Sequence, residues 1–219
     1  MKKGLTEIVF ILDKSGSMSG LESDTIGGYN SFLERQKKVE GEALVSTVLF
    51  SDYTNVIHDR VELGKIEPLT DKQYTTDGCT ALLDAIGGAI HHIGNVHKYA
   101  RDEDRPEKTV FVITTDGQEN SSREYSYAKI KKMIERQQEK YGWEFIFLGA
   151  NIDAIGEAAK LGIASNRAVR YECDSVGTML NFACMSESIK ELRECDAMPE
   201  NWKVEIENYH TKKNKKGRS

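Results

Sequence analysis

The sequence has 219 residues, of which 39% are hydrophobic, and its 30 Lys and Arg against 35 Asp and Glu give a net charge of -5. This length suits one hydrophobic core of ordinary size, and the mildly acidic balance does not favour a general nucleic-acid binder. No apolar run approaches the roughly 18 residues that a membrane-spanning helix requires. The first apolar stretch contains Glu7 and runs directly into Asp13, so it predicts a strand and not a signal peptide.

The cysteines lie far apart and include no CxxC pair. They are Cys79, Cys173, Cys184 and Cys195. This spacing indicates neither a zinc site nor a disulfide framework, and we expect buried thiols in a reducing cytoplasm. A chain of this build, without a signal peptide or an appended domain, also favours a bacterial or phage product.

Strand-like and helix-like segments alternate along the chain. In order, we expect a strand at residues 7–12, a helix at 25–40, strands at 43–50 and 54–59, a helix at 81–99, a strand at 109–114, a helix at 125–141, a strand at 143–148, a helix at 154–160, a strand at 167–171 and a helix at 176–194. The alternation predicts a doubly wound, Rossmann-like α/β fold with a mostly parallel sheet and helices on both faces. Residues 43–50 and 54–59 are too close for a crossover, so they predict an antiparallel hairpin at the sheet edge.

Beyond about residue 195 the helical periodicity fades. Trp202, Val204 and Ile206 alternate with polar residues, which predicts a short extended segment. The ending TKKNKKGRS is too polar and basic to bury, and we expect it to be disordered. We therefore divide the chain into a domain at 1–195 and a C-terminal extension at 196–219.

Two predicted helices contain glycine pairs. Gly27 and Gly28 fall within the first helix, and Gly87 and Gly88 within the second. Because glycine is unfavourable inside a helix, these positions indicate close packing or a bend.

Oxygen-bearing side chains follow two of the predicted strands. The first strand ends in Asp13, which Ser15 and Ser17 follow within a tight turn, and a later strand ends in Asp116. In α/β sheets the carboxyl ends of parallel strands carry the ligand sites, and a crossover can bring two such ends side by side at a switch point. Thr80 ends a glycine-containing loop before the second helix, so three loops are expected to converge.

The five candidate donors are all hard oxygens, with no His or Cys among them. Such donors suit Mg2+, with Mn2+ or Ca2+ as alternatives, better than zinc or copper. Each residue also has an ordinary explanation, since Asp and Ser form turns and Thr80 could cap the helix after it. The sequence therefore predicts a metal site but does not exclude three structural turns.

The pattern of Asp13, Ser15 and Ser17 (DxSxS), Thr80 and Asp116-Gly117 resembles the metal-ion-dependent adhesion site (MIDAS) of von Willebrand factor A (VWA) domains. DxSxS alone would be weak, but the three segments occur in the right order, and the resemblance in element order spans roughly residues 5–195. It implies that Ser15, Ser17 and Thr80 touch the metal directly. It also implies that Asp13 and Asp116 act through waters or through hydrogen bonds to the hydroxyls.

A cation held mainly by neutral hydroxyls keeps most of its positive charge, and a carboxylate from another protein can replace one of its waters. We therefore expect a metal-dependent protein-binding module whose partner offers an acidic side chain, and not an enzyme. We expect no membrane partner. We also expect no nucleic-acid partner, because no aromatic residues interleave the lysines that follow Tyr209. Salt-sensitive binding to RNA or DNA would test this expectation. Oligomeric state stays open.

Two alternatives belong to other classes. A metal-dependent hydrolase would need a general base, for which Glu119 is the nearest candidate, although a surface carboxylate is the simpler interpretation. Phosphatases of the HAD type also have an Asp after their first strand, but they need a second Asp two residues later, where this chain has Ser15. The other alternative is a scaffold subunit of an AAA+ ATPase assembly, with the ATPase on a separate protein because the chain has no GxxxxGK[ST] motif.

Overall fold

The computed structural model describes residues 1–195 and 197–216, which contain six strands and six α-helices. The strands are β1 (Lys2–Asp13), β2 (Glu42–Phe50), β3 (Thr54–Glu62), β4 (Pro106–Thr115), β5 (Glu144–Ala150) and β6 (Ala168–Tyr171). The α-helices are α1 (Glu22–Gln36), α2 (Leu82–Tyr99), α3 (Tyr127–Tyr141), α4 (Ala154–Lys160), α5 (Ser175–Cys195) and α6 (Val204–Lys216). None of the helices in these ranges is long and apolar enough to cross a membrane.

The strands form one sheet in the order β3-β2-β1-β4-β5-β6. All neighbours are parallel except β2 and β3, which pair antiparallel at the edge. From β1 the chain adds strands outward on one side, and from β4 it adds them on the other side. The carboxyl ends of β1 and β4 therefore lie side by side at the switch point of the sheet.

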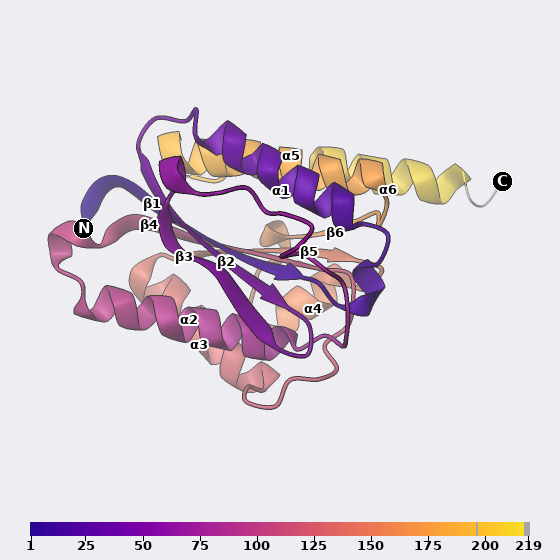
Figure 1. The fold of residues 1–219 in the computed structure, drawn as a ribbon, viewed down its shortest axis with the longest axis horizontal. Coiled ribbons are helices and arrows are strands. Elements are labelled where there is room, and N and C mark those ends of the chain that lie inside the picture. The colour runs from indigo at the N-terminus through magenta and orange to yellow at the C-terminus, as the bar shows by residue number, and fades with distance from the viewer. Residues whose placement is uncertain (196, 217–219) are drawn as a thin grey trace.

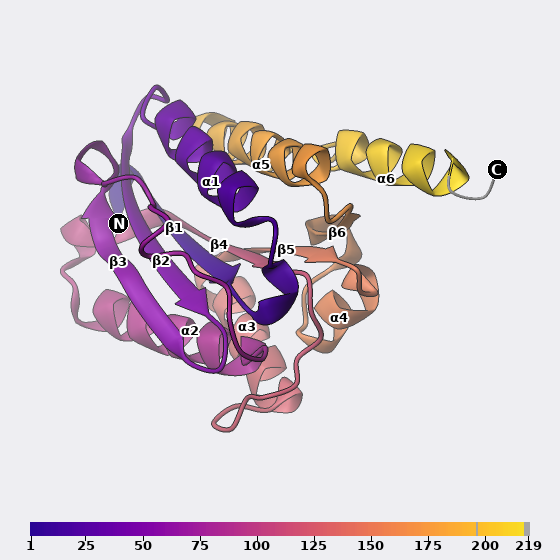
Figure 2. The same ribbon diagram turned by 45° about the vertical axis from the view of Figure 1, so that its right-hand side comes forward.

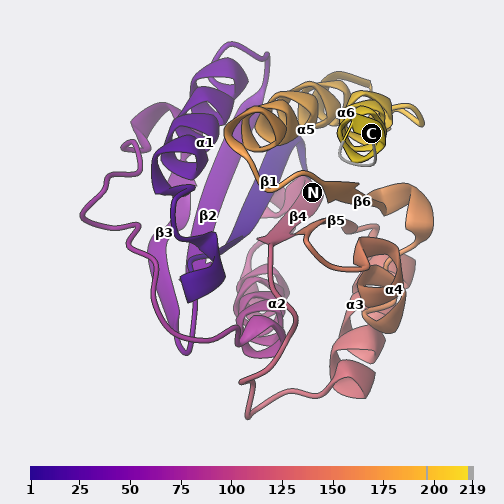
Figure 3. The same cartoon turned by 90° about the vertical axis from the view of Figure 1, so that its right-hand side faces the viewer.

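Helices cover both faces of this sheet, as Figures 1 to 3 show: α1, α5 and α6 lie on one face and α2, α3 and α4 on the other. The strands are nearly continuous apolar runs because both faces are buried, and alternate residues enter different cores. In β1, Phe10 contributes to the α1 and α5 side, where its ring meets those of Tyr29 and Phe32 edge to face at 5.2 and 4.8 Å. Its neighbours Val9 and Ile11 contribute to the opposite core.

The predicted doubly wound fold, the edge hairpin and the alternation of strands and helices are confirmed. Several predicted bounds were wrong at their ends. The first strand begins at Lys2 rather than residue 7, with a register irregularity before Thr6, and the first helix spans Glu22–Gln36 rather than 25–40. Polar residues at these ends gave no hydrophobic period from which to place the boundary.

The C-terminal segment corrects two expectations. Residues 204–216 form helix α6, whereas the sequence predicted an extended segment and then disorder. Trp202 and Ile206 are buried while Val204 is half exposed, so the burial follows the i, i+4 spacing at a helix end. An alternating strand would place those same two residues on one face, which explains the error. Residues 217–219 of the basic ending lie outside the described residues.

In each glycine pair, one glycine packs closely against an aromatic ring and the other faces open space. An ideal Cβ on Gly28 of α1 would lie 2.3 Å from the Phe182 ring of α5, while one on Gly27 would meet nothing within 4 Å. In α2, Gly87 lies against Tyr125 in the same way, and Gly88 faces open space. One glycine of each pair is therefore required by close packing against an aromatic ring, as the sequence indicated.

This difference predicts opposite effects for two neighbouring substitutions. We expect Gly28→Ala to lower the free energy of unfolding by about 1–3 kcal/mol, because the Phe182 ring must move within a filled core. We expect Gly27→Ala to raise it by about 0.5–1 kcal/mol, since alanine favours the helix and fits the open space. Urea unfolding of both variants measures these values, and equal effects would contradict the proposed contact.

Candidate metal centre

Asp13 ends β1 at the switch point and is almost completely buried. One of its carboxylate oxygens accepts a hydrogen bond from the backbone N–H of Ser15 at 2.7 Å, which shapes the turn that follows the strand. The other oxygen accepts one from the hydroxyl of Thr115, the last residue of the neighbouring strand β4, at 2.6 Å. The carboxylate thus joins the ends of the two central strands.

The hydroxyls of Ser15 and Ser17 connect the β1 turn to Asp116. Ser17 lies in a short 3-10 helix, Gly16–Met18, and its Oγ lies 3.1 Å from Ser15 Oγ. The same Ser17 hydroxyl donates to Asp116 Oδ1 at 2.5 Å. Four predicted site residues, Asp13 included, are therefore brought together from the ends of β1 and β4.

Thr80 completes the predicted set from the loop before α2. Its side chain is buried, and it does not cap the helix, because the N-cap position is Ala81 and has no side-chain cap. A Cβ added to Gly117 would lie 3.0 Å from Thr80 Oγ1 and 3.4 Å from Ser17 Oγ. Glycine at this position leaves space in which the three loops approach one another.

Backbone hydrogen bonds tie these loops together. Gly16 N–H donates to the carbonyl of Gly78 at 3.1 Å, and Asp77 N–H donates to that of Lys14 at 2.9 Å. The loop before α2 is also joined to the loop after Asp116. Thr80 N–H donates to the side-chain oxygen of Asn120 at 2.9 Å, and Asn120 N–H donates to the carbonyl of Thr80 at 3.1 Å. These bonds set the main-chain positions of the loops that carry the hydroxyls.

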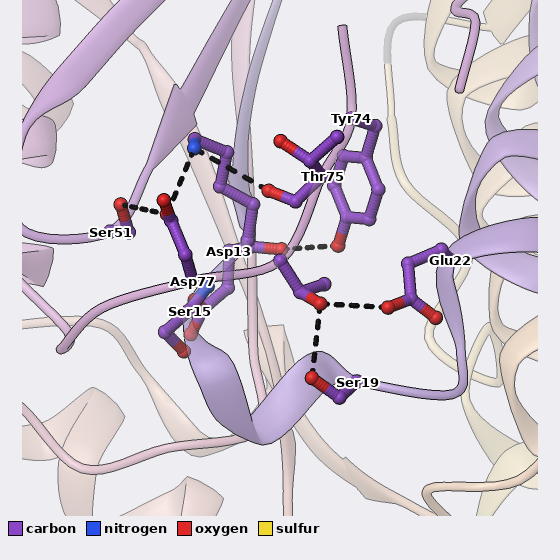
Figure 4. A network of polar contacts seen from close by, with 10 residues as sticks. Asp13, Ser15, Ser19, Glu22, Ser51, Tyr74, Thr75 and Asp77 are labelled. Atoms are coloured by element: carbon purple, nitrogen blue, oxygen red, sulfur yellow. Dashed lines mark hydrogen bonds and ion pairs between the residues drawn. The ribbon is translucent and has the colours of Figure 1, made fainter. Parts of the chain in front are cut away.

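Side chains reinforce the same junction (Figure 4). The hydroxyl of Tyr74 donates to the backbone carbonyl of Asp13, and the Thr76 hydroxyl donates to Glu22 at 2.7 Å. The buried Lys14 turns to the 75–77 loop, where its ammonium lies 3.3 Å from Asp77 Oδ1. The positive charge of Lys14 is thus engaged with Asp77 rather than with the site carboxylates.

The carboxylates of Asp13 and Asp116 are unfavourably placed without a cation. Burial raises the pKa of Asp13 to about 6, although hydrogen bonds from Ser15 and Thr115 oppose the shift. Burial also raises the pKa of Asp116, against its hydrogen bond from Ser17. Among residues 1–195 and 197–216, no Lys, Arg or His forms an ion pair with either carboxylate. The site therefore concentrates negative charge that a cation would neutralise.

The donor set fits a hard divalent cation. Within the described residues no three His, Cys, Asp or Glu side chains are grouped to hold a metal, so this site depends on hydroxyl oxygens beside its two carboxylates. The Thr80 hydroxyl lies beside the space that Gly117 leaves, 3.0 Å from where a Cβ would stand. Oxygen donors of this kind suit Mg2+, Mn2+ or Ca2+.

Sequence reasoning missed the residues that support the site. Thr115 and Tyr74 hold Asp13, and the thiol of Cys173 lies 3.8 Å from Asp116 Oδ2. Burial and the charge of Asp116 raise the pKa of that thiol. A threonine at a strand end and a tyrosine in a loop carry no separate signal. Only strand pairing and loop closure bring them to the aspartates.

Glu119, the candidate base, is committed to structure. Its carboxylate accepts hydrogen bonds from the backbone N–H groups of Leu83, Ser121 and Ser122 and from the Ser122 hydroxyl, at 2.8 to 3.0 Å. It thereby satisfies a free N–H in the first turn of α2 and shapes the loop after Asp116. This arrangement favours the structural interpretation of Glu119.

Comparison with known proteins gives structural likeness without sequence likeness. No protein-family model matches the chain, and no curated protein matches it by sequence. One similar structure is proximal thread matrix protein 1 from the mussel byssus with a zinc-occupied MIDAS motif, at 16% identity, a TM-score of 0.55, and coverage of 87% of this chain and 46% of that one. Another is a von Willebrand factor type A protein from Catenulispora acidiphila, at 14% identity, a TM-score of 0.54, and coverage of 85% and 42%.

A third is the pilus adhesin SpaC from Lactobacillus rhamnosus GG in its open conformation, at 11% identity and a TM-score of 0.61. The match covers 87% of this chain and 30% of the adhesin, so the chain spans less than half the length of each of these proteins. Together with the sheet order and the edge hairpin, these likenesses show that the chain has the VWA fold.

Proposed function

We propose that this protein is a metal-dependent protein-binding module. In this proposal Ser15, Ser17 and Thr80 hold a divalent cation directly, and Asp13 and Asp116 support it from behind through hydrogen bonds or water. Mg2+ is the proposed cation, with Mn2+ and Ca2+ as alternatives, because the donors are hard oxygens. The observation that carries the proposal is the pair of buried carboxylates that lack a cationic partner within the described residues, beside three converging hydroxyls.

The proposed partner is a protein that offers a Glu or Asp side chain. When bound, the cation would supply a positive charge that its hydroxyl ligands do not neutralise, together with a water that a carboxylate can replace. The residues of the chain fix the geometry: Thr115 and the Ser15 backbone orient Asp13, and Asp116 accepts from Ser17. A preorganised site of this kind loses little conformational freedom when it binds.

We propose no enzymatic role. A hydrolase would need a base beside the metal, and all the hydrogen bonds found for the nearest candidate, Glu119, hold the backbone or Ser122. We also propose the cytoplasm as the compartment. The four cysteines are free thiols, which suits a reducing environment. The expectation that they are buried was wrong, because Cys79 and Cys195 are exposed and Cys173 and Cys184 are only partly buried.

Two serines of the same short loop test the proposal. Ser17 faces the site, whereas the Ser19 hydroxyl lies 3.0 Å from that of Thr76, outside the site. We expect the protein to bind one Mn2+ per chain and Ser17→Ala to weaken this binding at least about tenfold. Ser19→Ala should leave it unchanged. Calorimetric titration with Mn2+ measures both.

The same variants test partner binding. Proteins retained from a lysate on immobilised protein in Mg2+ should elute with EDTA, and Ser17→Ala should retain less than Ser19→Ala. A partner held equally well in Mg2+ and EDTA would contradict the metal as the contact. Failure of the unsubstituted protein to bind Mn2+ would contradict the whole proposal.

A further inference from the structure

Three residues, Glu172, Cys173 and Asp174, connect β6 to α5, and helix α6 contacts the outer two. His210 of α6 forms an ion pair with Glu172 through its Nδ1. Tyr209 donates a hydrogen bond from its hydroxyl to Asp174, at 3.2 Å to the nearer oxygen, and Lys213 forms an ion pair with the same carboxylate. Residues one turn apart on α6 thus contact both sides of the 172–174 loop.

The middle residue of this loop contacts the metal centre. The Sγ of Cys173 lies 3.8 Å from Asp116 Oδ2, while Ser17 donates to the other oxygen, Oδ1. The carboxylate of Asp116 is therefore held from two directions, by a hydroxyl from the β1 turn and by a thiol from the 172–174 loop. A thiol is a weak donor that is protonated at neutral pH, so it can orient the carboxylate without adding a charge.

Helix α6 is attached firmly enough to set the position of this loop. Trp202, just before the helix, is buried and donates from Nε1 to the carbonyl of Asn166 at 2.8 Å, and Ile206 is also buried. Lys203 donates to the backbone carbonyls of Ser165 and Ala168 at 2.9 and 3.0 Å. Figures 1 and 3 show α6 beside α5 and close to β6, with its far end on the side to which the central strands point.

The tertiary contacts of α6 therefore form a continuous path to Asp116. We propose that α6 is a clamp on the metal centre: by holding the 172–174 loop it places the Cys173 thiol against Asp116 and so raises the affinity for the divalent cation. This inference rests on the proposed function and adds a means of regulating it. A partner that displaces α6 lowers metal affinity, and bound metal strengthens the hold of α6 by the same factor.

The role of Cys173 is that of a positioning residue, and a pair of substitutions tests it. Cys173→Val keeps the shape but removes the donor, and we expect Mn2+ affinity to fall about tenfold, as when a partner of a metal ligand is lost. Cys173→Ser keeps a donor and should remain within about threefold of the unsubstituted protein. A purely structural role would affect both variants through stability, which thermal unfolding in EDTA measures separately.

The clamp itself is tested on α6. The triple variant Tyr209→Phe, His210→Ala, Lys213→Met removes the contacts to the loop and keeps Trp202 and Ile206. We expect it to lower Mn2+ affinity about tenfold. Lys212→Met, an exposed lysine of the same helix, is the matched control and should have no effect. Because the clamp acts through Cys173, adding Cys173→Val to the triple variant should cause no further loss.

These measurements separate the clamp from the function on which it rests. If the unsubstituted protein binds Mn2+ and Ser17→Ala weakens binding, but Cys173→Val and the triple variant bind normally, the clamp is wrong and the metal centre stands. Losses that multiply in the combined variant would overturn the path through Cys173. If the unsubstituted protein does not bind Mn2+, the proposed function itself fails.

Discussion

Glu7→Ala should lower the free energy of unfolding by about 3–5 kcal/mol, the cost of breaking a buried ion pair by removing one partner. Glu7 is completely buried in the central strand β1, where Arg60 Nε lies 2.6 Å from one carboxylate oxygen and His97 forms a short contact with the other. The substitution would leave the Arg60 guanidinium and the His97 ring without their carboxylate acceptor. Urea unfolding at neutral pH measures the loss.

A second ion pair, at the start of β1 and β2, provides the control. Lys2 and Glu42 lie 2.7 Å apart, but their side chains are 42% and 68% exposed, so we expect Glu42→Ala to cost less than about 1 kcal/mol. A double-mutant cycle on Glu7 and Arg60 would show whether the buried pair is coupled. If Glu7→Ala and Glu42→Ala destabilise equally, the buried network does not hold the strands as inferred.

The fold could be predicted because its signals are local. Apolar runs such as that ending at Leu12 specify strands buried on both faces, and the short connection between β2 and β3 permits only a hairpin. His97 shows the limit. It is buried against Glu7, and its ring meets Trp143 edge to face at 5.3 Å. Its environment depends on a strand ninety positions away in the chain, which helical spacing cannot reveal.

The candidate site also has residues that the sequence could predict and one that it could not. Asp13, Ser15, Ser17, Thr80 and Asp116 formed a recognisable pattern because each follows or precedes a predictable element, and the structure brings them together. That they bind a metal stays a prediction. Cys173 was expected to be a buried thiol without a role in the site, since nothing near it in the sequence indicates that α6 and the 172–174 loop would bring it to Asp116.

The largest functional effect should come from Asp13→Asn, which we expect to weaken Mn2+ binding by about 100-fold or more, because it removes one of the two charges that attract the cation. The new amide can keep the local geometry. Its oxygen can accept from Ser15 N–H, and its NH2 can donate to the Thr115 hydroxyl, which would then donate to the Gly117 carbonyl at 3.1 Å. Calorimetric titration with Mn2+ measures the loss.

The same substitution should not destabilise the metal-free protein. Asp13 is buried without a cation, and burial raises its pKa to about 6, so its charge opposes folding at neutral pH. We therefore expect the thermal midpoint of Asp13→Asn in EDTA to equal or exceed that of the unsubstituted protein. Adding Mg2+ should raise the midpoint of the unsubstituted protein alone, since only that chain gains binding free energy from the ion. A variant that melts earlier in EDTA would mean that the carboxylate serves the fold, and this would remove the reason for inferring a cation beside it.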